Sequence, residues 1–208
     1  TQLPVAKLVE IARDAGALSL VDAVQVPGQL SMDVTAWDAD IVAAAGHKWL
    51  LSPWGGGFLS VDREVAASLA PRTLGYRSVE TPTANPYEFA AGARRFEVGS
   101  ANPAPHVALE EAIDVIDEIG VDALQDRIQR LAGQFAESVP SNRLLSPATP
   151  ESGLVTVDCG DETAATDLVE RTREAGVVVR SVPRDGWVRA SVHAFNTERD
   201  VERLAELL

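Results

Sequence analysis

Lysine is almost absent from this chain of 208 residues. Only Lys7 and Lys48 are lysines, and the other sixteen of the 18 basic residues are arginines. Acidic residues number 31, which gives a formal net charge of −13. This composition argues against the basic stripes that bind nucleic-acid phosphates, so we predict no nucleic-acid partner. An acidic, lysine-poor chain also suits concentrated salt, which favours a halophilic host.

Cysteine and long apolar runs are also scarce. Cys159 is the single cysteine, which excludes an internal disulfide framework and indicates a reducing compartment. No apolar run approaches the roughly 18 residues of a membrane-spanning helix, and no signal peptide opens the chain. We therefore predict a cytoplasmic protein with no membrane partner. Because the first residue is Thr1, we expect the chain to be cut from a longer polypeptide.

Short apolar runs between amphipathic segments predict an α/β fold. A helix is expected at 4–16, where Pro4 suits the first turn. Three buried strands are expected at 17–23, 40–46 and 56–62. Apolar strands of this length are typical of a sheet that helices cover on both faces.

The second half of the chain changes character after a proline-rich loop at 73–105. Two amphipathic helices follow this loop, at 106–120 and 121–139. Beyond residue 150 the pattern predicts a compact α+β unit. Its expected order is strand, helix, strand, strand and helix, at 152–159, 162–176, 177–182, 187–195 and 197–208.

Lys48 stands at the carboxyl end of a predicted strand, in "DIVAAAGHKW", directly after His47. In a chain rich in lysine, the ordinary interpretation of such a residue would be a surface lysine whose side chain extends from the strand end into solvent. Here lysine is rare, and the carboxyl edge of an open α/β sheet is where ligands bind. An amine at that edge is a nucleophile toward carbonyl groups, so we predict Schiff-base chemistry at Lys48.

Asp22 closes the preceding predicted strand, and Gln25 follows three residues later in "LSLVDAVQ". An aspartate at a strand end is usually a turn residue. However, pyridoxal phosphate requires an acid beside its pyridine nitrogen, because the protonated ring is the electron sink. Asp22, Gln25 and Lys48 at two strand ends therefore predict a site for pyridoxal phosphate.

These motifs resemble the class V aminotransferase-fold enzymes, which are fold-type I pyridoxal-phosphate proteins. The resemblance rests on "VDAVQVP", followed after about twenty residues by "GHKW" and a glycine-rich turn, and it covers the whole chain. The group includes cysteine desulfurases, isopenicillin N epimerase and kynureninase. The resemblance implies that Asp22 pairs with the pyridinium nitrogen and that Gln25 hydrogen-bonds the phenolic oxygen. It also implies that Lys48 binds the cofactor aldehyde and that His47 lies near the phosphate.

Two further motifs extend the resemblance. In "RRFEVGSANP", Ser100 matches a hydroxyl residue that reaches the cofactor phosphate of the opposite subunit, which implies a homodimer with shared active sites. In "WVRASVHAFNT", Arg189 matches an arginine that binds the α-carboxylate of an amino-acid substrate, and Arg180 is a weaker candidate. The implied fold is the C-terminal part of the large domain at 1–120, a connecting helix and loop at 121–150, and a small α+β domain at 151–208.

Two departures narrow the expected reaction. Cysteine desulfurases carry a nucleophilic cysteine in the small domain, and none lies in residues 180–189 here, so we predict no desulfurase activity. Ala45 stands where many relatives have a phosphate-binding hydroxyl. Epimerisation, elimination at a C–S bond and transamination all begin at the same carbanion and stay open. The alternative is a non-catalytic polypeptide, either a truncated product or half of a split enzyme.

Overall fold

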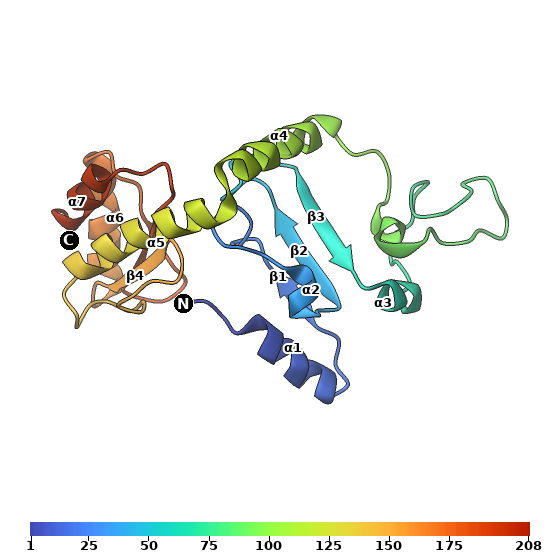
Figure 1. The fold of residues 1–208 in the computed structure, drawn as a ribbon, viewed down its shortest axis with the longest axis horizontal. Coiled ribbons are helices and arrows are strands. Elements are labelled where there is room, and N and C mark those ends of the chain that lie inside the picture. The colour runs from blue at the N-terminus through green and yellow to red at the C-terminus, as the bar shows by residue number, and fades with distance from the viewer. The chain divides into compact units, whose positions relative to one another are not determined.

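The computed structural model describes all residues, Thr1–Leu208, and they form two compact units. The unit that we call N-terminal comprises Pro4–Gly28 and Met32–Val115. The C-terminal unit comprises Thr1–Leu3, Gln29–Ser31 and Ile116–Leu208. Figure 1 labels most of the helices and strands of both.

A three-stranded sheet forms the centre of the N-terminal unit. Its strands are β1 (Leu20–Asp22), β2 (Ile41–Ala45) and β3 (Gly57–Val61), in that order (Figure 1). β1 pairs with β2 in parallel, and β2 pairs with β3 antiparallel. Because parallel strands run in one direction, the residues that follow β1 and β2 meet at the same edge of the sheet.

Ser19 and Asp40 tie the beginnings of β1 and β2 together. Asp40 Oδ2 accepts hydrogen bonds from the backbone N–H and the hydroxyl of Ser19, each at 2.7 Å. Ser19 Oγ in turn accepts from the Asp40 N–H at 3.0 Å. The Ser19 N–H and hydroxyl hold the pKa of Asp40 below its ordinary value, because both bonds favour the carboxylate. In the register of these two strands, Asp22 lies opposite Ala43.

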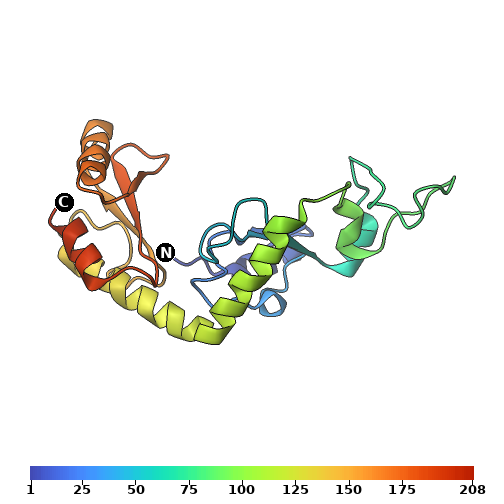
Figure 2. The ribbon, with the colours of Figure 1, turned by 90° about the horizontal axis from the view of Figure 1, so that it is seen from above.

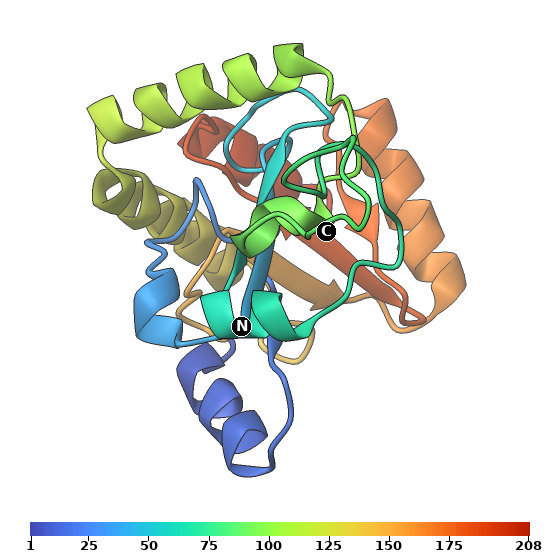
Figure 3. The ribbon, with the colours of Figure 1, turned by 90° about the vertical axis from the view of Figure 1, so that its right-hand side faces the viewer.

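Besides the first part of α4 (Pro103–Ile119), the N-terminal unit contains α1 (Val5–Asp14), α2 (Val34–Trp37), α3 (Arg63–Ser68) and the 3-10 helix η1 (Gly92–Phe96). The apolar pattern predicts α1 but neither α2 nor α3. Each of these two short helices begins at an aspartate, Asp33 or Asp62, whose side chain accepts two backbone N–H bonds. α3 and η1 pack together (Figure 3).

The prediction that all three strands are buried is wrong for this chain. Val42 of β2 is 1% exposed, but Leu20 of β1 is 65% exposed and Leu59 of β3 is 42% exposed. The outer edges of β1 and β3 carry no neighbouring strand, and the helices of this chain cover the faces of the sheet only in part. Leu20, Phe58 and Leu59 of the outer strands consequently face solvent, whereas Val21 and Val61 are half-buried.

The C-terminal unit has the predicted order of strand, helix, strand, strand and helix. Its sheet has the order β4-β6-β5 and is antiparallel throughout. The long helix α5 packs beside α7 (Figure 2). The buried core of the C-terminal unit includes Leu131, Phe135, Val155, Leu168, Val188 and Leu204. The elements are α5 (Val121–Ser138), β4 (Leu154–Asp158), α6 (Glu162–Glu174), β5 (Arg180–Ser181), β6 (Trp187–Ser191) and α7 (Glu198–Ala205).

Helix α4 (Pro103–Ile119) precedes α5, and both lie where the helical periodicity predicts them. By packing, α5 contributes to the core of the C-terminal unit, since Leu131 and Phe135 belong to its buried cluster. The predicted division into a large-domain part at 1–120, a connecting helix and loop at 121–150 and a small α+β domain at 151–208 stays a prediction. No helix of the structure has the length and apolar character needed to cross a membrane.

Candidate functional site

Four of the predicted site residues lie at one edge of the N-terminal sheet. Asp22 is the last residue of β1, and the Ala23 N–H extends the pairing to the carbonyl of Ala43 at 2.8 Å. His47 and Lys48 follow the end of β2. The parallel pairing therefore brings Asp22, Gln25 and the His47-Lys48 pair to the same rim.

The carboxylate of Asp22 is exposed at this rim. Its Oδ1 accepts the N–H of Val24 at 3.1 Å, which is the turn interaction that an aspartate at a strand end usually makes. The turn continues with the Val26 N–H bonded to the carbonyl of Ala23 at 2.8 Å. One carboxylate oxygen thus stabilises the turn while the side chain stays accessible to a ligand.

Gln25 is bonded to Trp49, the residue after Lys48. The indole Nε1–H of Trp49 donates to Gln25 Oε1 at 2.8 Å, and Trp49 is only 5% exposed. Gly28 packs against the same residue, because a Cβ at this position would overlap the carbonyl group of Trp49. The two sequence motifs are therefore in direct contact. Sequence reasoning gave no role to either residue, although Trp49 ends the quoted motif "GHKW" and Gly28 directly follows "VDAVQVP".

Lys48 is half-buried and forms no ion pair with a carboxylate. The segment after it is tightly turned: the Leu51 N–H donates to the Lys48 carbonyl at 3.2 Å, and Leu51 has a positive φ of 59°. A leucine in this left-handed region is strained, and such strain often marks functional segments. The amine thus lies in a constrained stretch of backbone without a competing carboxylate.

The ring of His47 stacks on Trp54, with ring centroids 3.9 Å apart and planes at 19°. Trp54 itself is 79% exposed. The glycines at 55–57 lead into β3, and a Cβ at Gly57 would lie 2.7 Å from the carbonyl oxygen of Ala44. The glycine at position 57 therefore permits β3 to pack closely against β2 after the glycine-rich turn.

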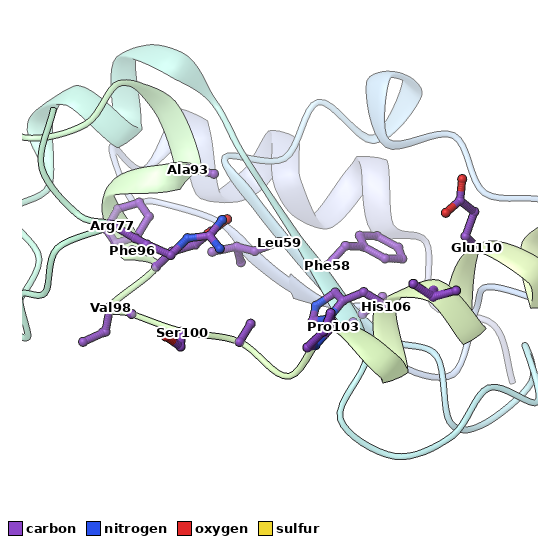
Figure 4. A pocket seen from close by; sticks show the side chains of 16 residues that line it. Phe58, Leu59, Arg77, Ala93, Phe96, Val98, Ser100, Pro103, His106 and Glu110 are labelled. Atoms are coloured by element: carbon purple, nitrogen blue, oxygen red, sulfur yellow. The ribbon is translucent and has the colours of Figure 1, made fainter.

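Ser100 lies in a different part of the N-terminal unit. Its hydroxyl is 2.7 Å from the hydroxyl of Tyr76, and it lines a cavity of about 1010 Å³ together with Arg77, Phe96 and His106 (Figure 4). Neither His47 nor Lys48 lines this cavity. Within a single chain, Ser100 is therefore not brought to the rim that carries Lys48. Tyr76, which contacts Ser100, was missed by sequence reasoning.

Arg189 lies on β6 of the C-terminal unit, directly opposite Arg180 of β5. Its neighbours Val188 and Ala190 point into the core, so Arg189 and Arg180 share the opposite face of the sheet. Neither arginine forms an ion pair, and Nε of Arg189 is buried without a hydrogen-bond partner. Burial, and then the nearby charge of Arg180, lower the pKa of Arg189. Like charges facing each other across a sheet are unfavourable, so this arrangement suits an anion.

Cys159 follows β4 and is half-buried against the core of the C-terminal unit. The guanidinium of Arg143 donates to its Sγ at 3.9 Å. No group of three or more histidine, cysteine, aspartate or glutamate side chains is arranged to hold a metal ion. The thiol is thus packed as a small hydrophobic residue.

The sequence model of the aminotransferase class-V family matches residues 1–204. Isopenicillin N epimerase from Amycolatopsis lactamdurans is 35% identical over 99% of this chain and 55% of its own length. A probable cysteine desulfurase from Methanothermobacter thermautotrophicus is 31% identical over 98% of this chain and 55% of its own length. The chain thus spans about half the length of the curated relatives that it matches.

Solved structures share the fold. The cystine C–S lyase C-DES, in complex with its product cysteine persulfide, matches with a TM-score of 0.85 at 25% identity, over 99% of this chain and 56% of C-DES. An apo cysteine desulfurase from Thermococcus onnurineus NA1 matches with 0.84 at 26% identity, over 98% of this chain and 55% of that one. A C-DES variant with glycine linked to its pyridoxal-phosphate cofactor gives 0.86 at 24% identity.

Proposed function

Because this chain belongs to the class V aminotransferase family, we propose that it forms part of a pyridoxal-phosphate enzyme that acts on an amino acid. The predicted resemblance to this family is confirmed. The α/β fold is confirmed as well, as about half of a fold-type I enzyme. Pyridoxal phosphate, the predicted cofactor, is the cofactor of this family. The observation that carries the proposal is the meeting of Asp22, Gln25 and Lys48 at one rim.

The residues at this rim fit the cofactor. Lys48 has an amine without an ion-pair partner, as covalent binding of an aldehyde requires. Asp22 has an exposed carboxylate whose Oδ1 accepts the Val24 N–H of the turn, which leaves Oδ2 for a protonated ring nitrogen. When bound, the cofactor supplies an electron sink that stabilises negative charge at Cα of an amino acid.

Each residue then has a defined task. Asp22 keeps a proton on the ring nitrogen, and Gln25 donates to the phenolic oxygen. Lys48 would bind the aldehyde group of the cofactor covalently. As a free amine, Lys48 would move the proton at Cα of the substrate. His47 is proposed to lie near the phosphate.

Arg189 is proposed to bind the α-carboxylate of the substrate. Its buried, unpaired Nε and the facing Arg180 favour an anion on this face of the C-terminal sheet. The planar guanidinium offers two parallel N–H donors to a carboxylate. This arrangement favours an amino-acid substrate.

Ser100 is proposed to serve the cofactor phosphate of a partner protomer. Its position away from Lys48 within one chain favours a role across a homodimer, with Tyr76 holding its hydroxyl. The homodimer with shared active sites is thus a proposal that rests on the family resemblance and on this separation.

The reaction is proposed to be epimerisation, elimination at a C–S bond or transamination. Relatives named epimerase and cysteine desulfurase match this chain over the same length, so their names leave the reaction open. The lack of a cysteine in residues 180–189, and the packed position of Cys159, favour a reaction other than desulfuration.

A non-catalytic role is the second candidate. The chain spans about half the length of its curated relatives, and its outer strands expose apolar side chains. Both observations favour a segment that works only together with further polypeptide.

Borohydride reduction in the presence of pyridoxal phosphate tests the proposed function. We expect peptide mapping of the reduced complete polypeptide to locate the label on the peptide that contains Lys48. Lys48→Arg should lose this label and the bound-cofactor absorbance, whereas the control Lys7→Arg should keep both. Retention of the full label in Lys48→Arg would show that another amine binds the cofactor.

A further inference from the structure

The bond between Trp49 and Gln25 identifies which atom of the Gln25 amide contacts the indole. A glutamine amide carries an acceptor, Oε1, and a donor, Nε2, and rotation by half a turn exchanges them. An indole N–H is a donor only. Because Trp49 Nε1 lies 2.8 Å from the amide, the atom that it contacts must be Oε1. Nε2 is then the branch of the amide directed away from the indole.

This orientation matters for the cofactor. The phenolic oxygen of pyridoxal phosphate is an acceptor when deprotonated, so only Nε2 of Gln25 can stabilise it. We propose that Trp49 is a positioning residue that presents Nε2 of Gln25, and not Oε1, to the phenolic oxygen of the cofactor. The inference rests on the proposed function, because it takes the cofactor to lie beside Gln25.

The surroundings of Trp49 make it a rigid support. The side chain is 5% exposed, and the backbone carbonyl is in contact with Gly28, where no Cβ fits. The turn between Asp22 and Gly28 is also closed by the Val26 N–H bonded to the Ala23 carbonyl. Since Trp49 directly follows Lys48, one residue links the backbone of the reactive lysine to the amide of Gln25.

A purely structural role for Trp49 makes a different prediction. If the indole only fills space, its replacement lowers the free energy of unfolding but leaves the bound cofactor unchanged. If the indole orients Gln25, the replacement also weakens cofactor binding and alters the cofactor absorption spectrum, and both effects depend on Gln25. Spectra and affinities therefore separate the two roles without a measurement of turnover.

The test uses Trp49→Phe in the complete polypeptide, with Trp37→Phe of α2 as the matched control. A neutral hydrogen bond typically contributes a few-fold to affinity, so we expect the dissociation constant of pyridoxal phosphate to rise about 3- to 10-fold in Trp49→Phe. The absorption maximum of the bound cofactor and its pH dependence should shift as well. Trp37→Phe should change none of these. Wild-type affinity and spectrum in a folded Trp49→Phe variant would overturn the inference.

A double-mutant cycle shows whether Trp49 acts through Gln25. In a Gln25→Leu background, Trp49→Phe should weaken cofactor binding no further, because the amide is already gone. Additive losses would overturn the inference. If Gln25→Leu alone leaves binding and spectrum unchanged, the proposed contact of Gln25 with the cofactor is wrong, which is a failure of the proposed function.

Gln25→Glu keeps the test decisive should Trp49→Phe fail to fold. A glutamate still accepts the indole N–H but has no donor in place of Nε2. We expect Gln25→Glu to fold and to lose cofactor affinity to at least the extent of Gln25→Leu. Wild-type affinity in Gln25→Glu would mean that no amide donor is needed, which would overturn both the proposed contact of Gln25 with the cofactor and the inference that rests on it.

Discussion

Single residues of this chain hold charged groups where the local structure gives them no partner. Lys48 forms no ion pair at the rim of the N-terminal sheet, and Arg189 has a buried Nε without a hydrogen bond. A buried polar atom without a partner costs about 1–3 kcal/mol, which a bound ligand can offset. Such positions are therefore candidates for binding rather than for stability.

We expect Arg189→Ala to separate function from stability. Loss of a charge-assisted, two-point bond to a carboxylate should cost about 2–3 kcal/mol, equivalent to an about 30- to 150-fold lower kcat/KM. The thermal midpoint of unfolding should be unchanged or raised, because the variant removes a buried donor that has no acceptor and the charge repulsion between Arg189 and Arg180. Kinetics and thermal unfolding of the complete enzyme measure both.

Arg199→Ala, which removes an exposed arginine of α7, is the control and should change neither quantity. The cofactor spectrum of Arg189→Ala should stay close to that of the wild type. Abolished cofactor binding with unchanged amino-acid affinity in the remaining holoenzyme would contradict the proposed role of Arg189.

Elements of the N-terminal unit are held in place by polar contacts at strand ends. The exchange between Ser19 and Asp40 closes the beginnings of β1 and β2, and Asp33 and Asp62 begin α2 and α3. The periodicity of α4 and α5 predicts these long helices, because each has an apolar face that repeats along the chain. A four- or six-residue helix has no such repeat, so α2 and α3 escape prediction.

We expect Asp40→Ala to destabilise the N-terminal unit by about 1–2 kcal/mol, since it leaves two donors of Ser19 without their acceptor. Because the pKa of Asp40 is lowered in the folded state, its contribution is present above pH 3.8 and is lost as the pH falls below that value. Urea unfolding at neutral pH and in acid measures the difference from the wild type.

The difference in the free energy of unfolding between the wild type and Asp40→Ala should shrink in acid, where Asp40 of the wild type is protonated. Asp14→Ala, in which an exposed aspartate of α1 is removed, should leave the free energy of unfolding unchanged at either pH. An Asp40→Ala effect that is the same at both pH values would show that the carboxylate charge does not contribute.

The whole molecule combines a strongly negative charge with exposed apolar strands. The formal net charge is −13, whereas Leu20, Phe58 and Leu59 on the outer strands are 65%, 37% and 42% exposed. Charge repulsion opposes association of chains, and apolar surface on an open sheet edge favours it. Which effect dominates depends on salt, because ions screen the repulsion and leave the apolar attraction in place.

We therefore expect the isolated 208-residue chain to associate more strongly as NaCl rises from about 0.05 to about 1 M, over which the screening length falls several-fold. Sedimentation velocity measures the distribution of species. Phe58→Ser combined with Leu59→Ser should reduce association, whereas Leu145→Ser, which removes a side chain that is 40% exposed in the C-terminal unit, should not. Dissociation on adding salt would contradict an apolar interface. Adaptation to a halophilic host stays a prediction.

The sequence by itself determined the family, the cofactor and the helices with a repeating apolar face. Chain order alone places Asp22 and Gln25 before Lys48 at a characteristic spacing, and helical periodicity is local. Only the tertiary structure decided that Trp49 donates to Gln25, that Arg180 faces Arg189 and that the outer strands are exposed. These features depend on strand register and on packing between segments distant in the chain, which no local pattern specifies.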